Sequence, residues 1–320
     1  MFSQKIINNL KNASFIRAMF EQGEKLRKTY GADNVFDFSI GNPDPEPPAA
    51  AIEALKGLVL NPTPKMHGYM SNAGYPDVRD KVAKQLTRET GVNLTQDSIV
   101  MTCGAGGALN VVLKTLLNPD EEVIVFSPFF VEYLFYIDNH GGKGVIVPTQ
   151  KDTFEPDLEA LKSNITPKTK AIIINTPNNP TGIIYSEQTL MGIAGVLALK
   201  EKEYGTTIYI VSDEPYRKLV YDNIKVPSVL ATFKNSVMVD SFSKSLSLPG
   251  ERIGYIVANP AIEDVELFVN GLIFCNRTLG FVNAPALFQR LVGESIDAVV
   301  DTAIYKERRD LLYNLSLIHI

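Results

Sequence analysis

The 320-residue sequence has few cysteines and histidines, which limits the kinds of site it can carry. Its two cysteines, Cys103 and Cys275, lie far apart, so they indicate neither a disulfide framework nor a Cys-x-x-Cys metal site. The three histidines lack a metal-ligand spacing such as His-Glu-x-x-His. We therefore expect no metal, a reducing compartment and a cytoplasmic location.

Long apolar runs and an excess of positive charge are also missing. No stretch reaches the ~18 consecutive apolar residues that indicate a membrane helix. The net charge of −5 disfavours nucleic acid or an anionic membrane as the main partner. The first 20 residues contain no acid, as in a transit peptide, but they have no strong apolar face and few arginines, so a polar N-terminal arm and helix is expected.

Short β-branched runs alternate with helical stretches from about residue 98 onward. Continuous apolar runs such as residues 172–174 are typical of parallel strands that are buried on both faces. Helices are expected over 105–117 and 186–204, the second with Ser186 as its N-cap and Gly205 as its stop. The pattern predicts an α/β fold with a mostly parallel, doubly wound sheet. Its expected strands are Ser98–Thr102, Glu122–Phe126, Gly144–Val147, Ala171–Asn175, Thr207–Ser212, Val237–Ser241 and Gly254–Ala258.

The length suggests about two domains, at a prior of ~150 residues for each. The proline-rich segment 41–48 is expected to be a linker or an active-site loop. We expect residues 1–47 to form an N-terminal arm and part of a small domain. Residues 48–288 would form the large domain that carries the site, and residues 289–320 would begin an incomplete C-terminal small domain.

Ligand sites in such sheets lie at the carboxyl ends of the strands. The run CGAGGAL at residues 103–109 follows an expected strand and opens an expected helix. Glycines at this place let backbone N–H groups approach an anion at the helix N-terminus. The run is neither a complete G-x-G-x-x-G nor a Walker A motif, so a simple tight turn explains it equally well.

Three further strand ends carry polar motifs: TPNNPTG at 176–182, DEPY at 213–216 and DSFSKSLSLPGER at 240–252. Each alone reads as a turn or a solvated loop. Together the four ends offer an anion site, a carboxylate with a nearby phenol, an amide, and the amine of Lys244 beside hydroxyls and the guanidinium of Arg252. These groups fit one molecule with a phosphate, an aldehyde and a basic ring nitrogen, which is pyridoxal 5′-phosphate.

In this order and combination the motifs resemble those of the class I and II aminotransferases of fold type I, the aspartate aminotransferase superfamily, from about Phe38 to Tyr313. The resemblance implies that Lys244 bonds to the aldehyde of the cofactor and moves the catalytic proton. It implies that Asp213 pairs with the pyridine nitrogen and keeps it protonated, so that the ring accepts electrons.

The remaining roles that the resemblance implies are binding roles. Tyr216 and Asn179 would hydrogen-bond the 3′-oxygen, and Asn179 and Gly41 would lie near the substrate carboxylate. Tyr69 would reach the phosphate of a neighbouring subunit, which implies a homodimer. The phosphate and ring contacts are expected from Ala105, Gly106, Phe130, Ser241, Ser243 and Arg252.

The chain departs from the family pattern at its C-terminal end. It stops shortly after Arg309, and no residue matches the family's arginine that binds the substrate α-carboxylate. We therefore expect a truncated chain that binds cofactor and transaminates poorly. Arg277 lies near where some relatives carry a substrate-side-chain arginine from the partner subunit, but a surface salt bridge is an equally good reading.

Transfer of an amino group from an L-amino acid to a 2-oxo acid is the leading prediction, with aspartate and aromatic donors as candidates. A β-eliminating C–S lyase and an inactive cofactor-binding fragment remain alternatives, since the same motifs serve all three. A regulator's effector-binding domain is disfavoured, because the first 40 residues are too few for a helix-turn-helix module. A hydrolase is disfavoured by the lack of G-x-S-x-G.

Overall fold

The computed structural model describes residues 2–36 and 41–317, with the side chains of 11–21 left aside. Phe38, where the resemblance begins, lies outside the described residues, as do residues 318–320. The chain divides into two compact units, Met1–Asp44 and Pro45–Ile320. The first contains helix α1 (Gln4–Tyr30) and the 3₁₀ turn η1 (Ala32–Asn34). The expected domain boundaries after residues 47 and 288 stay predictions.

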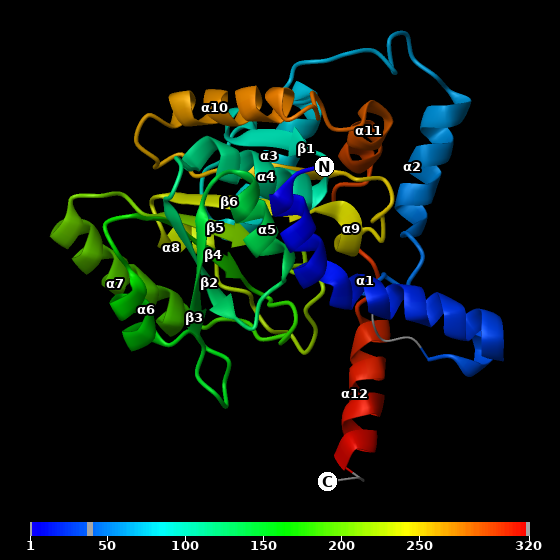
Figure 1. The fold of residues 1–320 in the computed structure, drawn as a ribbon. Helices are drawn as coiled ribbons and strands as arrows, with labels where there is room; N and C mark the ends of the chain where they lie inside the picture. The colour runs from blue at the N-terminus through cyan, green and yellow to red at the C-terminus, as the bar shows by residue number, and fades with distance from the viewer. Residues whose placement is uncertain (1, 37–40, 318–320) are drawn as a thin grey trace. The chain divides into compact units, whose positions relative to one another are not determined.

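Within the described residues, seven strands of the second unit form one sheet in the order β1-β7-β6-β5-β4-β2-β3 (Figure 1). Strand β7 runs antiparallel to both of its neighbours, and all other pairs are parallel. The expected strands are all present, and the mostly parallel α/β fold is confirmed. The strands are β1 (Ile99–Thr102), β2 (Glu122–Ser127), β3 (Lys143–Pro148), β4 (Thr169–Asn175), β5 (Tyr209–Asp213), β6 (Ser236–Ser241) and β7 (Gly254–Ala258).

Helices cover both faces of this sheet, except along the edge strand β3, most of whose residues are exposed. Successive strand residues point to opposite faces, so each face has its own core. On one face, Val211 and the residues of the other strands that point the same way pack with α4 (Gly104–Leu116), α5 (Glu132–Asn139) and α10 (Val265–Thr278). On the other face, Ile210 and its equivalents pack in two clusters. These clusters include α2 (Ala49–Leu60), α3 (Pro76–Thr90), α6 (Leu158–Asn164), α7 (Glu187–Tyr204), α8 (Val229–Thr232), α9 (Phe242–Ser245) and α11 (Ala286–Glu294).

The ends of the helices follow the expected signals. The Ser186 hydroxyl accepts a hydrogen bond from the Thr189 backbone N–H at 3.0 Å, which caps α7. Gly205 ends α7 in the left-handed conformation, with φ of 65°. A 3₁₀ turn η2 (Gln96–Ser98) precedes β1, and α12 (Ala303–Leu317) is the last described helix. Across residues 2–36 and 41–317, none of the helices has the length and apolar character needed to span a membrane.

Gly254 lets β7 approach the turn that opens α4. A Cβ atom added there would lie 2.5 Å from the Asp240 carbonyl oxygen and 2.9 Å from Gly104 Cα. Both neighbours are backbone atoms, which cannot rotate out of the way. Strand β7 therefore fits between β6 and the Gly104 turn only without a side chain at this position.

We predict that Gly254→Ala lowers the free energy of unfolding by about 1–3 kcal/mol or more, because overpacking forces backbone shifts. Gly195→Ala is the matched control: Gly195 is exposed on α7 and a Cβ there meets nothing within 4 Å. This control should gain about 0.5–1 kcal/mol from higher helix propensity. Urea unfolding followed by circular dichroism measures both, and equal stability of Gly254→Ala and the parent would contradict the close contact.

Candidate active site

One pocket lies at the edge where the parallel strands β1, β4, β5 and β6 end, as expected for this type of sheet. Each of these strands places the residues that follow it, or its own last residues, into the pocket wall. Within the second unit, the structure brings together all the predicted site residues except Tyr69. Those that line the pocket are Ala105, Gly106, Phe130, Asn179, Asp213, Tyr216, Ser241, Ser243, Lys244 and Arg252.

Asp213 closes β5 and is 5% exposed. Its Oδ2 accepts a hydrogen bond from the Tyr133 hydroxyl at 2.6 Å, whereas its buried Oδ1 has no hydrogen-bond partner. Burial raises the pKa of Asp213 to about 7, the Tyr133 hydrogen bond opposes this, and the nearby Glu214 charge adds to it. A buried oxygen without a partner costs stability, so this carboxylate is suited to a cationic donor in the pocket.

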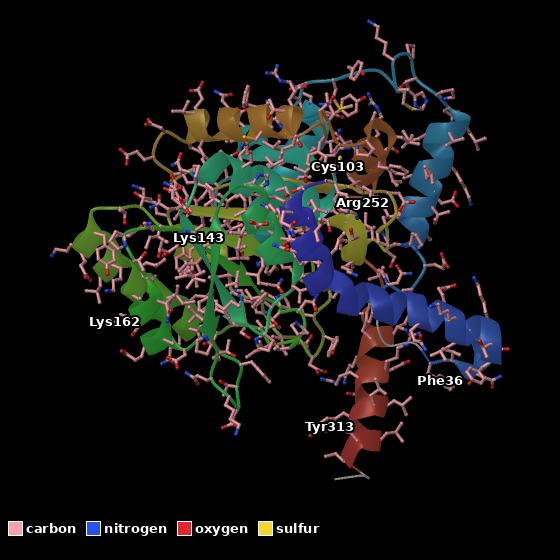
Figure 2. The ribbon with its side chains drawn as sticks, viewed as in Figure 1. Phe36, Cys103, Lys143, Lys162, Arg252 and Tyr313 are labelled. Atoms are coloured by element: carbon pink, nitrogen blue, oxygen red, sulfur yellow. The ribbon has the colours of Figure 1, made fainter. Side chains whose placement is uncertain are left out.

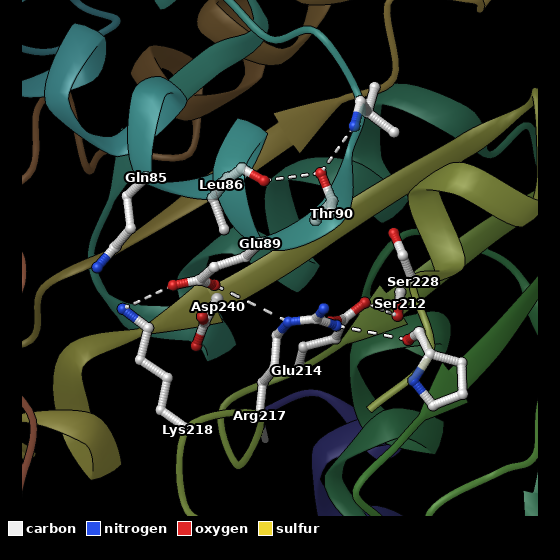
Figure 3. A network of polar contacts seen from close by, with 12 residues as sticks. Gln85, Leu86, Glu89, Thr90, Ser212, Glu214, Arg217, Lys218, Ser228 and Asp240 are labelled. Atoms are coloured by element: carbon white, nitrogen blue, oxygen red, sulfur yellow. Dashed lines mark hydrogen bonds and ion pairs between the residues drawn. The ribbon is translucent and has the colours of Figure 1, made fainter. Parts of the chain in front are cut away.

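The neighbouring acid, Glu214, does not line the pocket, and both of its oxygens are paired (Figure 3). It is 1% exposed, and its two oxygens accept from the Ser212 hydroxyl at 2.6 Å and from Arg217 at 2.8 Å. Arg217 and Lys218 also pair with Glu89 of α3, at 4.0 and 3.5 Å. The two acids of the DEPY motif therefore have different roles. Asp213 lines the pocket, whereas Glu214 binds Arg217, which in turn pairs with Glu89 of α3.

Asn179 is held by Asn175, the last residue of β4. The Asn175 side chain accepts from the Asn179 backbone N–H at 2.6 Å and donates to the Asp213 carbonyl at 2.8 Å. The Asn179 side chain hydrogen-bonds the Tyr216 hydroxyl. Burial and the Asp213 charge raise the pKa of Tyr216, and the Asn179 hydrogen bond opposes the rise. The amide and the phenol thus form one unit next to the carboxylate.

Lys244 lies on the short helix α9, directly after β6, and lines the same pocket. Burial lowers its pKa from the usual lysine value, because the charged ammonium is poorly solvated there. A lowered pKa increases the fraction of neutral amine, which is the form that attacks carbonyls and accepts protons.

The glycine turn and Arg252 form the other end of the pocket. Gly104 has φ of 72°, and a Cβ atom there would lie 2.9 Å from the Arg252 guanidinium. Arg252 and Cys103 lie close to each other (Figure 2), and the arginine charge opposes the rise in the Cys103 pKa that burial causes. Backbone N–H groups at a helix N-terminus beside a guanidinium form a strong anion site.

Tyr69 and Arg277 are not among the residues that line this pocket. Tyr69 is 94% exposed and borders a different hollow with His67 and Asn283. Gly41 belongs to the N-terminal unit, so its role near the substrate stays a prediction. Arg277 lies in the last turn of α10, with its guanidinium carbon 5.4 Å from the centre of the Phe274 ring.

Tyr133, Tyr136 and Asn175 also line the pocket, although no sequence motif predicted them there. Tyr133 and Tyr136 are three apart on α5, so they share one face of that helix. A Cβ atom on Gly106 would lie 3.1 Å from the Tyr136 hydroxyl oxygen, which places this phenol above the glycine turn. The only advance signal was the presence of two phenols at helical spacing just after the Phe129-Phe130 pair.

Comparison with known proteins shows which family this chain is similar to. A profile of the family "Aminotransferase class I and II" matches residues 33–315. The probable aspartate aminotransferase of Methanocaldococcus jannaschii is 32% identical over 285 residues, which are 87% of this chain and 72% of that protein. Aromatic-amino-acid aminotransferase 2 of Thermococcus litoralis is 33% identical over 314 residues, 94% of this chain and 75% of that protein.

A crystal structure of an aminotransferase from Eubacterium rectale superposes with a TM-score of 0.93 at 38% identity. The match covers 98% of this chain and 80% of that one. The family match over most of the chain, the sequence relatives and the common fold all lead to one assignment. The chain belongs to the class I and II aminotransferases, a family of enzymes that depends on pyridoxal 5′-phosphate.

Proposed function

We propose that this chain binds pyridoxal 5′-phosphate and transfers an amino group from an L-amino acid to a 2-oxo acid. The observation that carries the proposal is the meeting of Lys244 and Asp213 in one pocket, where a buried carboxylate oxygen has no partner. The names of the similar proteins, which include aspartate and aromatic-amino-acid aminotransferases, favour aspartate and aromatic amino acids as the first donors to test.

The pocket residues fit the cofactor at both of its ends. The Oδ1 atom of Asp213 would pair with the protonated ring nitrogen, and the N–H groups of the glycine turn with Arg252 would hold the phosphate. Ser241 and Ser243 offer further hydroxyl donors, and Phe130 offers a ring for stacking. When bound, the cofactor supplies an electron sink that stabilises negative charge at the substrate Cα.

Lys244 would take the proton from the substrate Cα and would deliver it to the carbon atom of the cofactor that carried the aldehyde. The amine needs to be neutral for the first of these steps, and the burial that lowers its pKa favours that form. Asn179 and Tyr216 would orient the bound cofactor by hydrogen bonds to its ring oxygen, since the amide and the phenol are already joined.

We predict that addition of cofactor produces a visible absorption band, and that L-aspartate or an aromatic L-amino acid bleaches it. Lys244→Ala should abolish the borohydride-reducible adduct and lower transamination by at least about 10³-fold, because it removes both the covalent anchor and the proton carrier. Lys162→Ala, an exposed lysine on α6, is the control and should behave as the parent.

The products decide between the reactions that these residues allow. A keto acid together with the aminated cofactor supports transamination. Ammonia with pyruvate from a β-substituted donor supports a β-eliminating lyase and overturns the proposal. A bound cofactor that reacts with no donor supports an inactive cofactor-binding chain, and a reducible adduct in Lys244→Ala shows that another amine is used.

The raised pKa of Asp213 gives a second test, on the cofactor-free protein. Its folded-state pKa of about 7 lies above the ordinary value of 3.8, so the folded protein holds this proton more tightly than the unfolded chain. Stability from this group is therefore lost as pH rises from about 4 to about 7. We predict that the melting temperature of Asp213→Asn minus that of the parent increases as pH rises through this range and stays constant above it. A difference independent of pH would contradict the assignment.

We further propose a homodimer in which Tyr69 serves the neighbour's site, because this phenol is exposed and lies outside its own pocket. Mixing Tyr69→Phe with Lys244→Ala tests this. In a mixed dimer, one site would keep both residues if Tyr69 acts across the interface. We predict activity of about a quarter of the parent's after subunit exchange, since about half the dimers are mixed and each has one complete site. Activity at the mean of the separate variants would contradict the proposal.

A further inference from the structure

Tyr133 links α5 to the end of β5 through the pocket carboxylate. It is 2% exposed, and its hydroxyl donates to Asp213 Oδ2 at 2.6 Å. Its backbone N–H donates to the Phe130 carbonyl at 3.1 Å, and its ring meets the Phe130 ring edge-on at 5.5 Å. One buried tyrosine therefore contacts two pocket residues that come from different elements.

A second buried tyrosine–aspartate pair on the next strand serves as an internal comparison. The Tyr255 hydroxyl donates to Asp240 Oδ2 at 2.7 Å, and the Ser241 backbone N–H donates to Asp240 Oδ1 at 2.6 Å. In the register of β5 and β6, Asp213 lies opposite Val239, so Asp240 points to the other face of the sheet. Both oxygens of Asp240 are satisfied, whereas Asp213 has one oxygen left without a partner.

The difference between the two pairs indicates what Tyr133 does. A carboxylate can rotate about its Cβ–Cγ bond, and a single strong hydrogen bond fixes which oxygen faces which way. Tyr133 occupies Oδ2 from the helix side, so Oδ1 is the oxygen that is left without a partner. Without the Tyr133 hydroxyl, neither oxygen of the buried Asp213 side chain would be held by a side-chain hydrogen bond.

We propose that Tyr133 is a positioning residue that holds the Asp213 carboxylate with Oδ1 available to the ring nitrogen of the cofactor. The inference rests on the proposed cofactor site, and it adds a residue that acts through Asp213. Through its contact with Phe130, the same phenol also couples the carboxylate to the aromatic side chain expected to stack on the ring.

The hydrogen bond also favours the ionised form of Asp213, against the effect of burial. Removing it should therefore raise the pKa of Asp213 further. The ionisable groups that surround this carboxylate, or line the same pocket, are Tyr133 and Tyr136 of α5, Glu214 and Tyr216 after β5, Lys244 of α9 and Arg252. They are the same in the parent and in a Tyr133→Phe variant, apart from the phenol itself.

A double-mutant cycle on the cofactor-free protein tests the pair without any activity measurement. Tyr133→Phe, Asp213→Asn and the double variant are unfolded in urea at pH 5 and pH 8. At pH 8, we expect the effects on the unfolding equilibrium constant to depart from additivity by ~10-fold or more, as for a hydrogen bond to a charged group. At pH 5 the carboxyl group is protonated and the coupling should shrink. Additive effects at both pH values would overturn the proposal.

The second measurement is cofactor binding by absorbance titration. We expect Tyr133→Phe to raise the dissociation constant of pyridoxal 5′-phosphate by ~10-fold at pH 8, since the charged hydrogen bond to the ring is weakened. Tyr255→Phe is the matched control, because it removes the equivalent bond on the opposite face. It should lower stability yet leave cofactor affinity unchanged and show no coupling to Asp213.

The outcomes separate this inference from the proposed function. If the parent protein fails to bind the cofactor, the proposed function fails, while the cycle still reports whether Tyr133 holds Asp213. If the parent binds and Tyr133→Phe binds equally well, the positioning role is wrong and the proposed function stands. Should Tyr133→Phe fail to fold, Tyr133→Phe in the Asp213→Asn background removes the unpaired charge. A folded double variant then supports the coupling, and an equally unfolded one overturns it.

Discussion

The site depends on one buried carboxylate, in which only one of the two oxygens has a hydrogen-bond partner. Asp213 lies at the end of a strand with apolar residues on both faces, and a single phenol reaches one of its oxygens. A buried polar atom without a partner is rare in folded proteins because it costs the full desolvation free energy. At Asp213 this cost falls in the wall of the pocket, where a positively charged group would remove it.

The alternation of side chains along a strand separates binding from support. Asp213 faces the pocket, and Glu214, the next residue, enters a fully paired network with Arg217 on the other side. On the neighbouring strand, Asp240 is likewise satisfied by Tyr255 and by a backbone N–H group. A short acidic motif thus places one carboxylate in the pocket wall and uses another to hold the loop, because the backbone turns each successive side chain to the opposite face.

Parallel strands explain how motifs far apart in sequence form one site. Four strands end at the same edge of the sheet and carry the site there. This edge holds the glycine turn after β1, the asparagine turn after β4, the acid at the end of β5 and the lysine after β6. The antiparallel strand β7 lies between β1 and β6, and Gly254 lets it do so without pushing the Gly104 turn aside. Backbone packing at Gly254 therefore sets how closely β7 approaches the Gly104 turn.

The sequence by itself determined the strands, the caps of α7 and most of the pocket wall. Apolar runs fix the buried strands locally, and the strand-end rule then places Lys244, Asp213, Asn179 and Arg252 at one edge. Only the tertiary structure decided that Tyr133 anchors Asp213 and that Asn175 joins the Asn179 backbone to β5. Those contacts depend on how α5 packs on the sheet and on the rotamer of each side chain, neither of which is encoded in a local pattern. The same holds for the unpaired Oδ1 atom, since a partner's absence is a property of the whole packed neighbourhood.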